Sequence, residues 1–108
     1  MMIGQAIIEL TEVLKMNPDN IRALCNRFVA YFRISNYEKA IYDNNKAHKL
    51  LKDRIDDYYY KNIDFDSAIA ELEAKEKLEP NNIEVKQTLL DLKDLKWFAS
   101  GWMLGRVG

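Results

Sequence analysis

The sequence predicts an all-α protein built from antiparallel helix-turn-helix repeats. Both prolines of the chain lie in closely similar phrases, residues 16–20 (MNPDN) and 78–82 (LEPNN), and each phrase separates two runs with helical periodicity. In addition, an Ala-Ile pair recurs at Ala6, Ala40 and Ala68, 34 residues apart in the first interval and 28 in the second. Similar helical runs at regular spacing are the sequence pattern of a repeat protein.

The two proline phrases predict where helices stop and start. Pro18 and Pro80 cannot continue a helix, and the Asp or Asn residues after each proline can cap the next helix by accepting hydrogen bonds from its first N–H groups. The Ala-Ile pairs at 6 and 68 each begin 12 residues before a proline, so the preceding runs match as well. Read in order, the chain contains helices at about residues 3–16, 21–34, 37–51, 53–61, 66–78 and 83–97.

The first repeat is predicted to be incomplete and a later one to be short. Ala6 matches alanines in the second helices of later repeats, so the run 3–16 enters the array at a second helix. Between residues 37 and 61 there is no Pro or Gly, and this is where the period loses six residues. Either one helix ends near Leu51 and another begins at once, or a single long helix runs from 37 to 61. The family-like spacing after residue 59 favours a break, whereas the helix propensity of 46–52 favours continuity.

The order of aromatic and small residues carries a family resemblance. In residues 59–69 (YYKNIDFDSAI) an aromatic near the end of one helix, a short turn, a second aromatic and an Ala-Ile pair follow one another, and residues 31–41 repeat this order. Together with the 34-residue period, this resembles the tetratricopeptide repeat family over most of the chain. The resemblance implies a right-handed solenoid in which the first helices of successive repeats line a concave groove.

Packing accounts for the pattern, because small and large side chains interdigitate where helices cross. We expect Ala6, Ala40 and Ala68 at close crossings, with aromatic side chains filling the grooves between helices: Tyr31, Tyr37, Tyr59 and Phe65. Two positions depart from the family, since Phe28 and Asp56 stand where a small residue is usual. They predict altered packing, and Asp56 needs solvent or a basic partner such as Lys52.

Composition is that of one folded domain, which we place at residues 1–96, followed by an atypical tail at 97–108. The chain of 108 residues is 48% hydrophobic and 31% charged, well away from the composition of disordered segments. The tail concentrates Trp97, Phe98, Trp102, Met103 and Leu104 among glycines, which is unlike a polar terminal helix. Its apolar run is far shorter than the roughly 20 residues of a membrane span, so no membrane crossing is predicted.

The resemblance also implies a peptide site. Residues 24–27 (LCNR), with Tyr31 and residues 37–43, are similar to the middle repeat of the co-chaperones that bind the acidic C-terminal tails of the major cytosolic chaperones. In that subgroup the asparagine matching Asn26 holds a terminal carboxylate, and an arginine matches Arg54. Arg33 and Lys61 each follow an aromatic by two residues toward the groove. The implied peptide-binding set is therefore Asn26, Arg33, Arg54 and Lys61, although Leu50 stands where a further lysine is usual.

Other chemistries are not expected. His48 is the only histidine and Cys25 the only cysteine, so the sequence offers no metal site, cofactor site or disulfide, and Cys25 reads as a small core residue. No nucleophile, acid–base pair or phosphate-binding loop is recognisable, so we do not expect an enzyme. The net charge of −1 provides no overall positive potential that would attract nucleic acid. The absence of a secretory signal pattern and of paired cysteines favours the cytoplasm.

Two functional readings follow. The first is a protein–protein interaction module, a co-chaperone-like adaptor that binds a short peptide segment, such as an acidic C-terminal tail, in a concave helical groove. The alternative is a structural, self-associating part of a longer repeat solenoid that lacks an intact peptide site, which the incomplete first repeat and the apolar 97–104 run favour.

Overall fold

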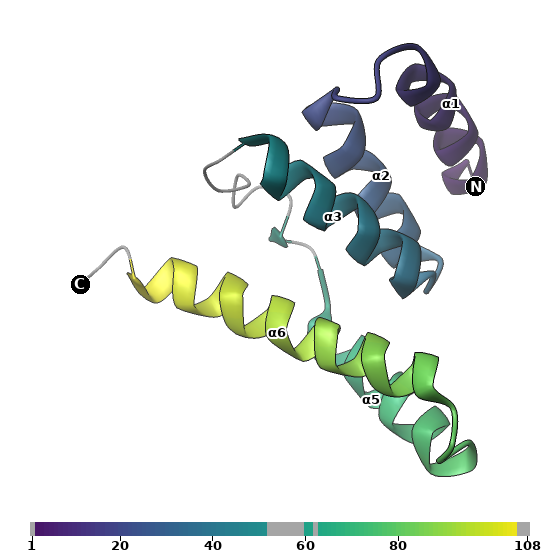
Figure 1. Ribbon diagram of the computed structural model, residues 1–108, viewed down its shortest axis with the longest axis vertical. Coiled ribbons are helices and arrows are strands. Elements are labelled where there is room, and N and C mark those ends of the chain that lie inside the picture. The colour runs from purple at the N-terminus through teal and green to yellow at the C-terminus, as the bar shows by residue number, and fades with distance from the viewer. Residues whose placement is uncertain (1, 52–59, 62, 106–108) are drawn as a thin grey trace. The chain divides into compact units, whose positions relative to one another are not determined.

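The computed structural model describes residues 2–51, 60–61 and 63–105, and over these ranges the chain is α-helical with no strand, as the sequence predicts (Figure 1). Side chains are described up to residue 97, except for residue 51. The described helices are α1 (Ile3–Met16), α2 (Ile21–Arg33), α3 (Tyr37–Leu51), α5 (Phe65–Leu78) and α6 (Ile83–Gly105).

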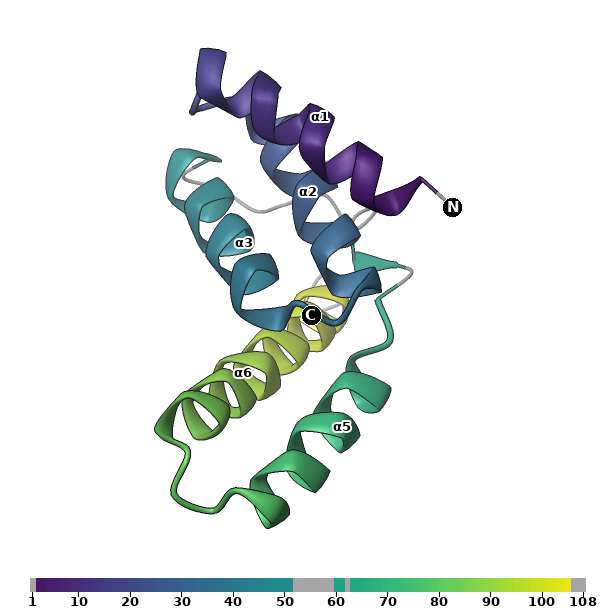
Figure 2. The ribbon, with the colours of Figure 1, turned by 90° about the vertical axis from the view of Figure 1, so that its right-hand side faces the viewer.

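The chain divides into two compact units, Met1–Ile63 and Asp64–Gly108, which we describe separately. In the first unit, α2 lies between α1 and α3 and packs against both (Figures 1 and 2). Within the described residues, α1 and α3 do not contact each other. Helix α2 is therefore the element that holds the first unit together.

Local signals in the sequence set the ends of α2. The side chain of Asn20 caps its first turn by accepting a hydrogen bond of 3.0 Å from the Ala23 N–H, as the capping prediction requires. At the other end, Ser35 adopts a left-handed conformation (φ 60°), and the Asn36 N–H donates to the Tyr31 carbonyl at 2.9 Å. This is how a chain commonly leaves a helix, and it turns the backbone directly into α3.

The core of the first unit is built on α2. Leu24, Cys25 and Phe28 are essentially inaccessible to solvent, and Ala40 and Ala47 of α3 lie equally deep. The Phe28 ring makes edge contacts with the rings of Phe32 and Tyr60, at centroid distances of 5.7 and 5.9 Å. The unusual Phe28 is thus accommodated by aromatic packing, which stabilises such cores beyond simple burial.

The second unit is an antiparallel pair of helices (Figure 2). Asp64 caps α5 by accepting from the Ser67 N–H at 3.0 Å and from its hydroxyl at 2.7 Å, and Asn82 caps α6 by accepting from the Val85 N–H at 3.2 Å. One apolar face of each helix is buried in the contact: Ala68, Leu72, Val85, Leu89, Leu92 and Leu95. Ion pairs join the rims of the two helices, at Glu76–Lys86, Glu73–Lys93 and Asp66–Lys96.

Most predicted helix bounds are confirmed to within a residue, and the exception is the last helix. Helix α6 continues to Gly105, beyond the expected end at residue 97, because neither Ser100 nor Gly101 is enough to stop it. Whether residues 1–96 form a domain distinct from a 97–108 tail stays a prediction. The choice between one helix and two in 37–61 falls on residues 52–59, outside the described chain, as do Asp56 and Tyr59.

The expected small and aromatic packing positions are partly confirmed. Ala40 and Ala68 are buried, and Tyr37 is also in the core. Ala6 and Phe65 are only half-buried. Tyr31 is half-buried as well, and its ring lies against Arg27 of α2 and Lys39 of α3.

In the part of the chain that the structure describes, no helix combines the length and the apolar character that crossing a bilayer requires.

Candidate functional site

The first feature of interest is the outward side of α2. Arg22, Asn26 and Arg33 are exposed, and Val29 between them is half-buried. Their spacing of four, three and four residues places them on one helix face. We call these four residues the α2 face. Two of the predicted peptide-binding residues, Asn26 and Arg33, thus share a face and lie about 10 Å apart along the helix axis.

The α2 face is rich in unpaired hydrogen-bond donors. Among the described residues, no acidic side chain forms an ion pair with Arg22 or Arg33. Each guanidinium carries five N–H donors in a planar fork that matches a carboxylate, and Asn26 adds an amide that can both donate and accept. The face can therefore receive an anionic group without first breaking an internal contact.

Lys61 is exposed in the turn that follows Tyr60, whose ring contacts Phe28 of α2. The fourth predicted residue, Arg54, lies outside the described residues. The family resemblance did not single out Arg22. The sequence signal that could have identified it is its position four residues before Asn26, which places both on one helix face.

The second feature is a buried ion pair beneath the α2 face. The Arg27 guanidinium binds the Asp43 carboxylate through two hydrogen bonds, Nε to Oδ2 at 2.7 Å and Nη2 to Oδ1 at 2.8 Å. Asp43 has no solvent exposure, and the Arg27 side chain retains only 15%. The hydrogen bonds that Arg27 donates to the Asp43 carboxylate raise the pKa of Arg27 above its ordinary value, although burial opposes the shift. Arg27 is held in the charged form.

Arg27 also connects helices that do not touch. Its Nη1 donates to the Thr11 hydroxyl of α1 at 3.2 Å, and Thr11 in turn donates to the Ile7 carbonyl at 2.7 Å. One side chain of α2 therefore reaches both α1 and α3.

Tyr31 covers two cations at the edge of this cluster. The Arg27 guanidinium carbon lies 5.6 Å from the centre of its ring, and the Lys39 ammonium lies 5.7 Å from it. Both distances lie within the range of cation–π attraction, which contributes about 0.5 to 2 kcal/mol depending on exposure. The Tyr31 ring thus adds a contact between α2 and Lys39 of α3.

The third feature is a polar chain inside the first unit. The Tyr60 hydroxyl donates to Asn44 Oδ1 at 2.9 Å, and His48 Nε2 lies 3.0 Å from the same hydroxyl oxygen. Asn44 and Tyr60 are both buried. These hydrogen bonds therefore fix Tyr60, the residue that follows segment 52–59, against α3.

The environment of Cys25 disfavours reaction of its thiol. Burial, with a smaller effect of the nearby Asp43 carboxylate, raises the pKa of the Cys25 thiol to about 11. A thiol of this kind stays protonated at neutral pH and is a poor nucleophile. Cys25 is a core residue, as the sequence predicts. Over the described ranges, no three His, Cys, Asp or Glu side chains come together as metal ligands do.

Comparison with known proteins leaves these features to be interpreted from the chain itself. No protein-family model, no curated protein and no solved structure matches the sequence or the fold. The tetratricopeptide resemblance therefore rests on the residue pattern alone.

Proposed function

We propose that the protein is a protein–protein interaction module that binds a short, anionic peptide segment along the α2 face. The observation that carries this proposal is the row formed by Arg22, Asn26 and Arg33, all exposed and on one helix face. A row of donors without internal acidic partners is suited to a carboxylate-bearing ligand. The co-chaperone-like reading, with an acidic C-terminal tail as ligand, belongs to this proposal.

The buried ion pair supports the same proposal indirectly. A binding helix that is fixed from two sides loses little conformational entropy when a ligand binds, so more of the interaction energy appears as affinity. Thr11 and Asp43 hold Arg27, and α2 with it, from α1 and α3. The half-buried Val29 adds a small apolar contact for a peptide side chain in the middle of the row.

The test is a binding titration with the full chain. We would follow the fluorescence anisotropy of a labelled hexapeptide, rich in Glu and Asp, with a free C-terminal carboxylate. Replacing Arg22 and Asn26 together with Ala is expected to weaken binding at least about tenfold, or about 1.4 kcal/mol. Arg33→Ala and Arg54→Ala, introduced separately, test the two predicted arginines in the same way.

A matched control comes from α3, where Asn45 and Lys49 are exposed four residues apart. Replacing both with Ala removes a cation and an amide at the same spacing and should leave the affinity unchanged. Equal losses in the two double variants would reduce the effect to net charge and overturn the assignment to the α2 face. Amidation of the peptide C-terminus tells whether the terminal carboxylate itself is recognised.

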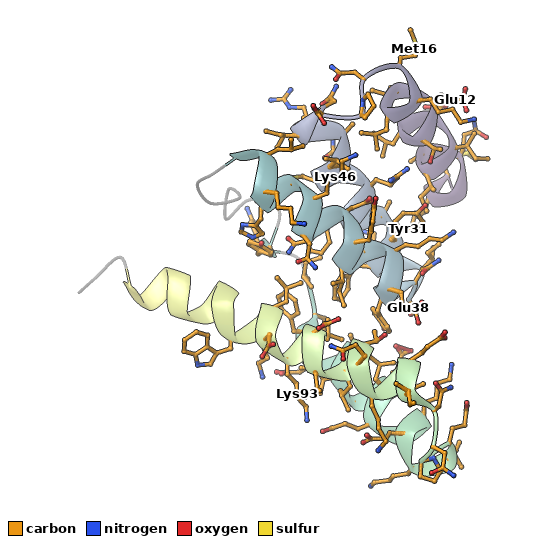
Figure 3. All side chains as sticks on the ribbon, viewed as in Figure 1. Glu12, Met16, Tyr31, Glu38, Lys46 and Lys93 are labelled. Atoms are coloured by element: carbon orange, nitrogen blue, oxygen red, sulfur yellow. The ribbon has the colours of Figure 1, made fainter. Side chains whose placement is uncertain are left out.

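A second candidate function, self-association, is favoured by the outer flank of α1. Met2, Val13 and Met16 are exposed, and their spacing places them on one side of the helix. Met16, which is 89% exposed, lies at the end of α1 (Figure 3). Analytical ultracentrifugation would separate the two candidates. A peptide-binding module should sediment as a monomer, whereas a dimer lost on Val13→Glu with Met16→Glu would favour the structural alternative.

The cellular setting is also part of the proposal. A single, buried cysteine suits a reducing compartment, and we place the protein in the cytoplasm on that ground. We assign it no catalytic role and no cofactor.

A further inference from the structure

Helix α6 has two apolar faces, and only one of them packs against α5. The buried face contains Val85, Leu89, Leu92 and Leu95. Ile83, Leu90 and Trp97 lie on the other side of the helix, and their exposed fractions are 78%, 57% and 76%. We call these three residues the α6 outer stripe.

The spacing within the stripe matches the surface of a helical partner. Successive members are seven residues apart, which keeps them within about 40° of one another around the helix and spreads them over about 21 Å of its length. Apolar residues repeated every seven positions form the seam along which two helices pack. An extended peptide has a different repeat and would not meet all three side chains in register.

The two borders of the stripe differ in charge. On one border lie Lys86 and Lys93, and their ammonium groups are 3.2 and 3.4 Å from carboxylates of α5, Glu76 and Glu73. That border is neutralised within the unit. On the other border lies Asp94, with Asp91 farther around the helix, and no basic side chain of the described chain forms an ion pair with either. Asp91 accepts only the neutral Gln87 amide, at 3.0 Å.

We propose that the α6 outer stripe binds a basic amphipathic helix of another protein. The partner supplies apolar side chains every seven residues to Ile83, Leu90 and Trp97, and Lys or Arg residues to the acidic border at Asp91 and Asp94. This inference is independent of the function proposed for the α2 face, since it uses none of the same residues.

Charge also sets this occupant apart from a second copy of α6. In an antiparallel pair of identical helices, like borders meet, so the acidic border of one copy would face the acidic border of the other. In a parallel pair the acidic border would meet Lys86 and Lys93, which are already engaged by Glu76 and Glu73. A partner helix with unpaired basic residues can form ion pairs with the acidic border. It does so without like-charge repulsion and without breaking the ion pairs of Lys86 and Lys93.

The test uses two designed 21-residue helical peptides without Trp, each with Leu at every seventh position. One has Arg at the positions beside the Leu seam and the other has Glu there. The protein is the full chain with Trp102→Phe, so that Trp97 is the remaining indole of the two in the sequence. Binding of the Arg peptide is expected to shift Trp97 emission to shorter wavelength, with an affinity at least tenfold above that of the Glu peptide and reduced by added salt.

Variants assign the effect to the stripe and its border. Leu90→Asp should abolish binding of the Arg peptide. Asp91→Lys with Asp94→Lys should reverse the preference in favour of the Glu peptide. Leu78→Asp is the matched control, because Leu78 is 83% exposed in the same unit but lies outside the stripe, and it should leave binding unchanged. Circular dichroism of each variant verifies that the helices are retained.

Three results would overturn the proposal. They are failure of both peptides to bind, equal affinity for the two, and retention of binding by Leu90→Asp. Sedimentation of the unliganded chain tests whether a second copy occupies the stripe. A dimer that Leu90→Asp converts to monomer would assign the stripe to that second copy and would also overturn the proposal.

Discussion

At the scale of single residues, Asp43 is the position on which the first unit depends most. Its carboxylate has no contact with solvent and is bound at both oxygens by Arg27. A buried pair of this kind contributes little compared with a well-packed apolar pair, but removing one partner leaves an uncompensated buried charge. The cost of losing Asp43 is therefore large even though the net benefit of the pair is small.

We expect Asp43→Ala to lower the free energy of unfolding by about 3 to 5 kcal/mol. Urea unfolding followed by circular dichroism measures the change. Lys15→Ala provides the comparison, because it removes an exposed ion pair with Glu12 that should be worth at most about 1 kcal/mol. A similar loss in both variants would contradict the importance given to burial.

Cys25 provides a chemical probe of the same region. With its pKa raised to about 11, the thiol is almost fully protonated at pH 8, and it is also 1% exposed. We expect an aromatic disulfide reagent to modify it far more slowly in the folded chain than in urea, and Asp43→Ala to accelerate the reaction in buffer. Fast labelling of the native protein would contradict the burial of Cys25.

Tyr60 is the third residue with a distinct role, since its hydroxyl serves two partners. Tyr60→Phe keeps the ring contact with Phe28 but removes the donor to Asn44, which leaves a buried amide oxygen without that bond. The expected loss is about 1 to 3 kcal/mol. Tyr42→Phe, at a position 63% exposed, should change the free energy of unfolding by less than about 0.5 kcal/mol in the same urea titration.

At the scale of elements, helix ends were the part of the fold most open to prediction. The proline phrases, Asn20 and Asn82 act within a few residues of themselves, so their effect can be read directly from the sequence. The end of α6 was not predictable in this way, because the signals near residue 100 are weak and oppose one another. The bounds of α1, α2, α3 and α5 followed from local chemistry alone.

The Asp64 cap of α5 makes the stability of this helix depend on pH. Hydrogen bonds from the backbone and side chain of Ser67 lower the pKa of Asp64 below its ordinary value. A lowered folded-state pKa means that the cap stabilises the helix above the pKa of the unfolded chain, and that this contribution is lost as pH falls through the folded-state pKa. The melting temperature of the wild type should therefore fall more steeply in acid than that of Asp64→Asn, which still accepts the backbone hydrogen bond but does not titrate.

At the scale of the whole molecule, the all-α class was predictable and the pairing of side chains was not. Arg27 and Asp43 are 16 residues apart on different helices, and only the crossing of α2 and α3 brings them together. Of the candidate site, Asn26 and Arg33 could be placed on one face by helical periodicity. The relation of Arg54 and Lys61 to that face depends on the path of the chain after α3, which helical periodicity within α2 does not determine.

Each of the two units has its own buried core, and this predicts separable responses to substitution. Leu92→Ala removes a fully buried side chain of α6 and is expected to cost the second unit about 2 to 5 kcal/mol. Circular dichroism should detect the loss, whereas the labelling rate of Cys25, which reports on the first unit, should change little in buffer. Acceleration of Cys25 labelling to the level of Asp43→Ala would show that the two units unfold together.

The position of Arg27 has a consequence for how sequence changes in this protein should be interpreted. A single guanidinium links α1 and α3, so the orientation of the helix that presents Asn26 depends on Thr11 and Asp43, neither of which belongs to the α2 face. If the α2 face binds a peptide as proposed, a substitution at position 11 or 43 is expected to change peptide affinity from the far side of the helix. Under that proposal, residues that screens would classify as structural are also determinants of recognition.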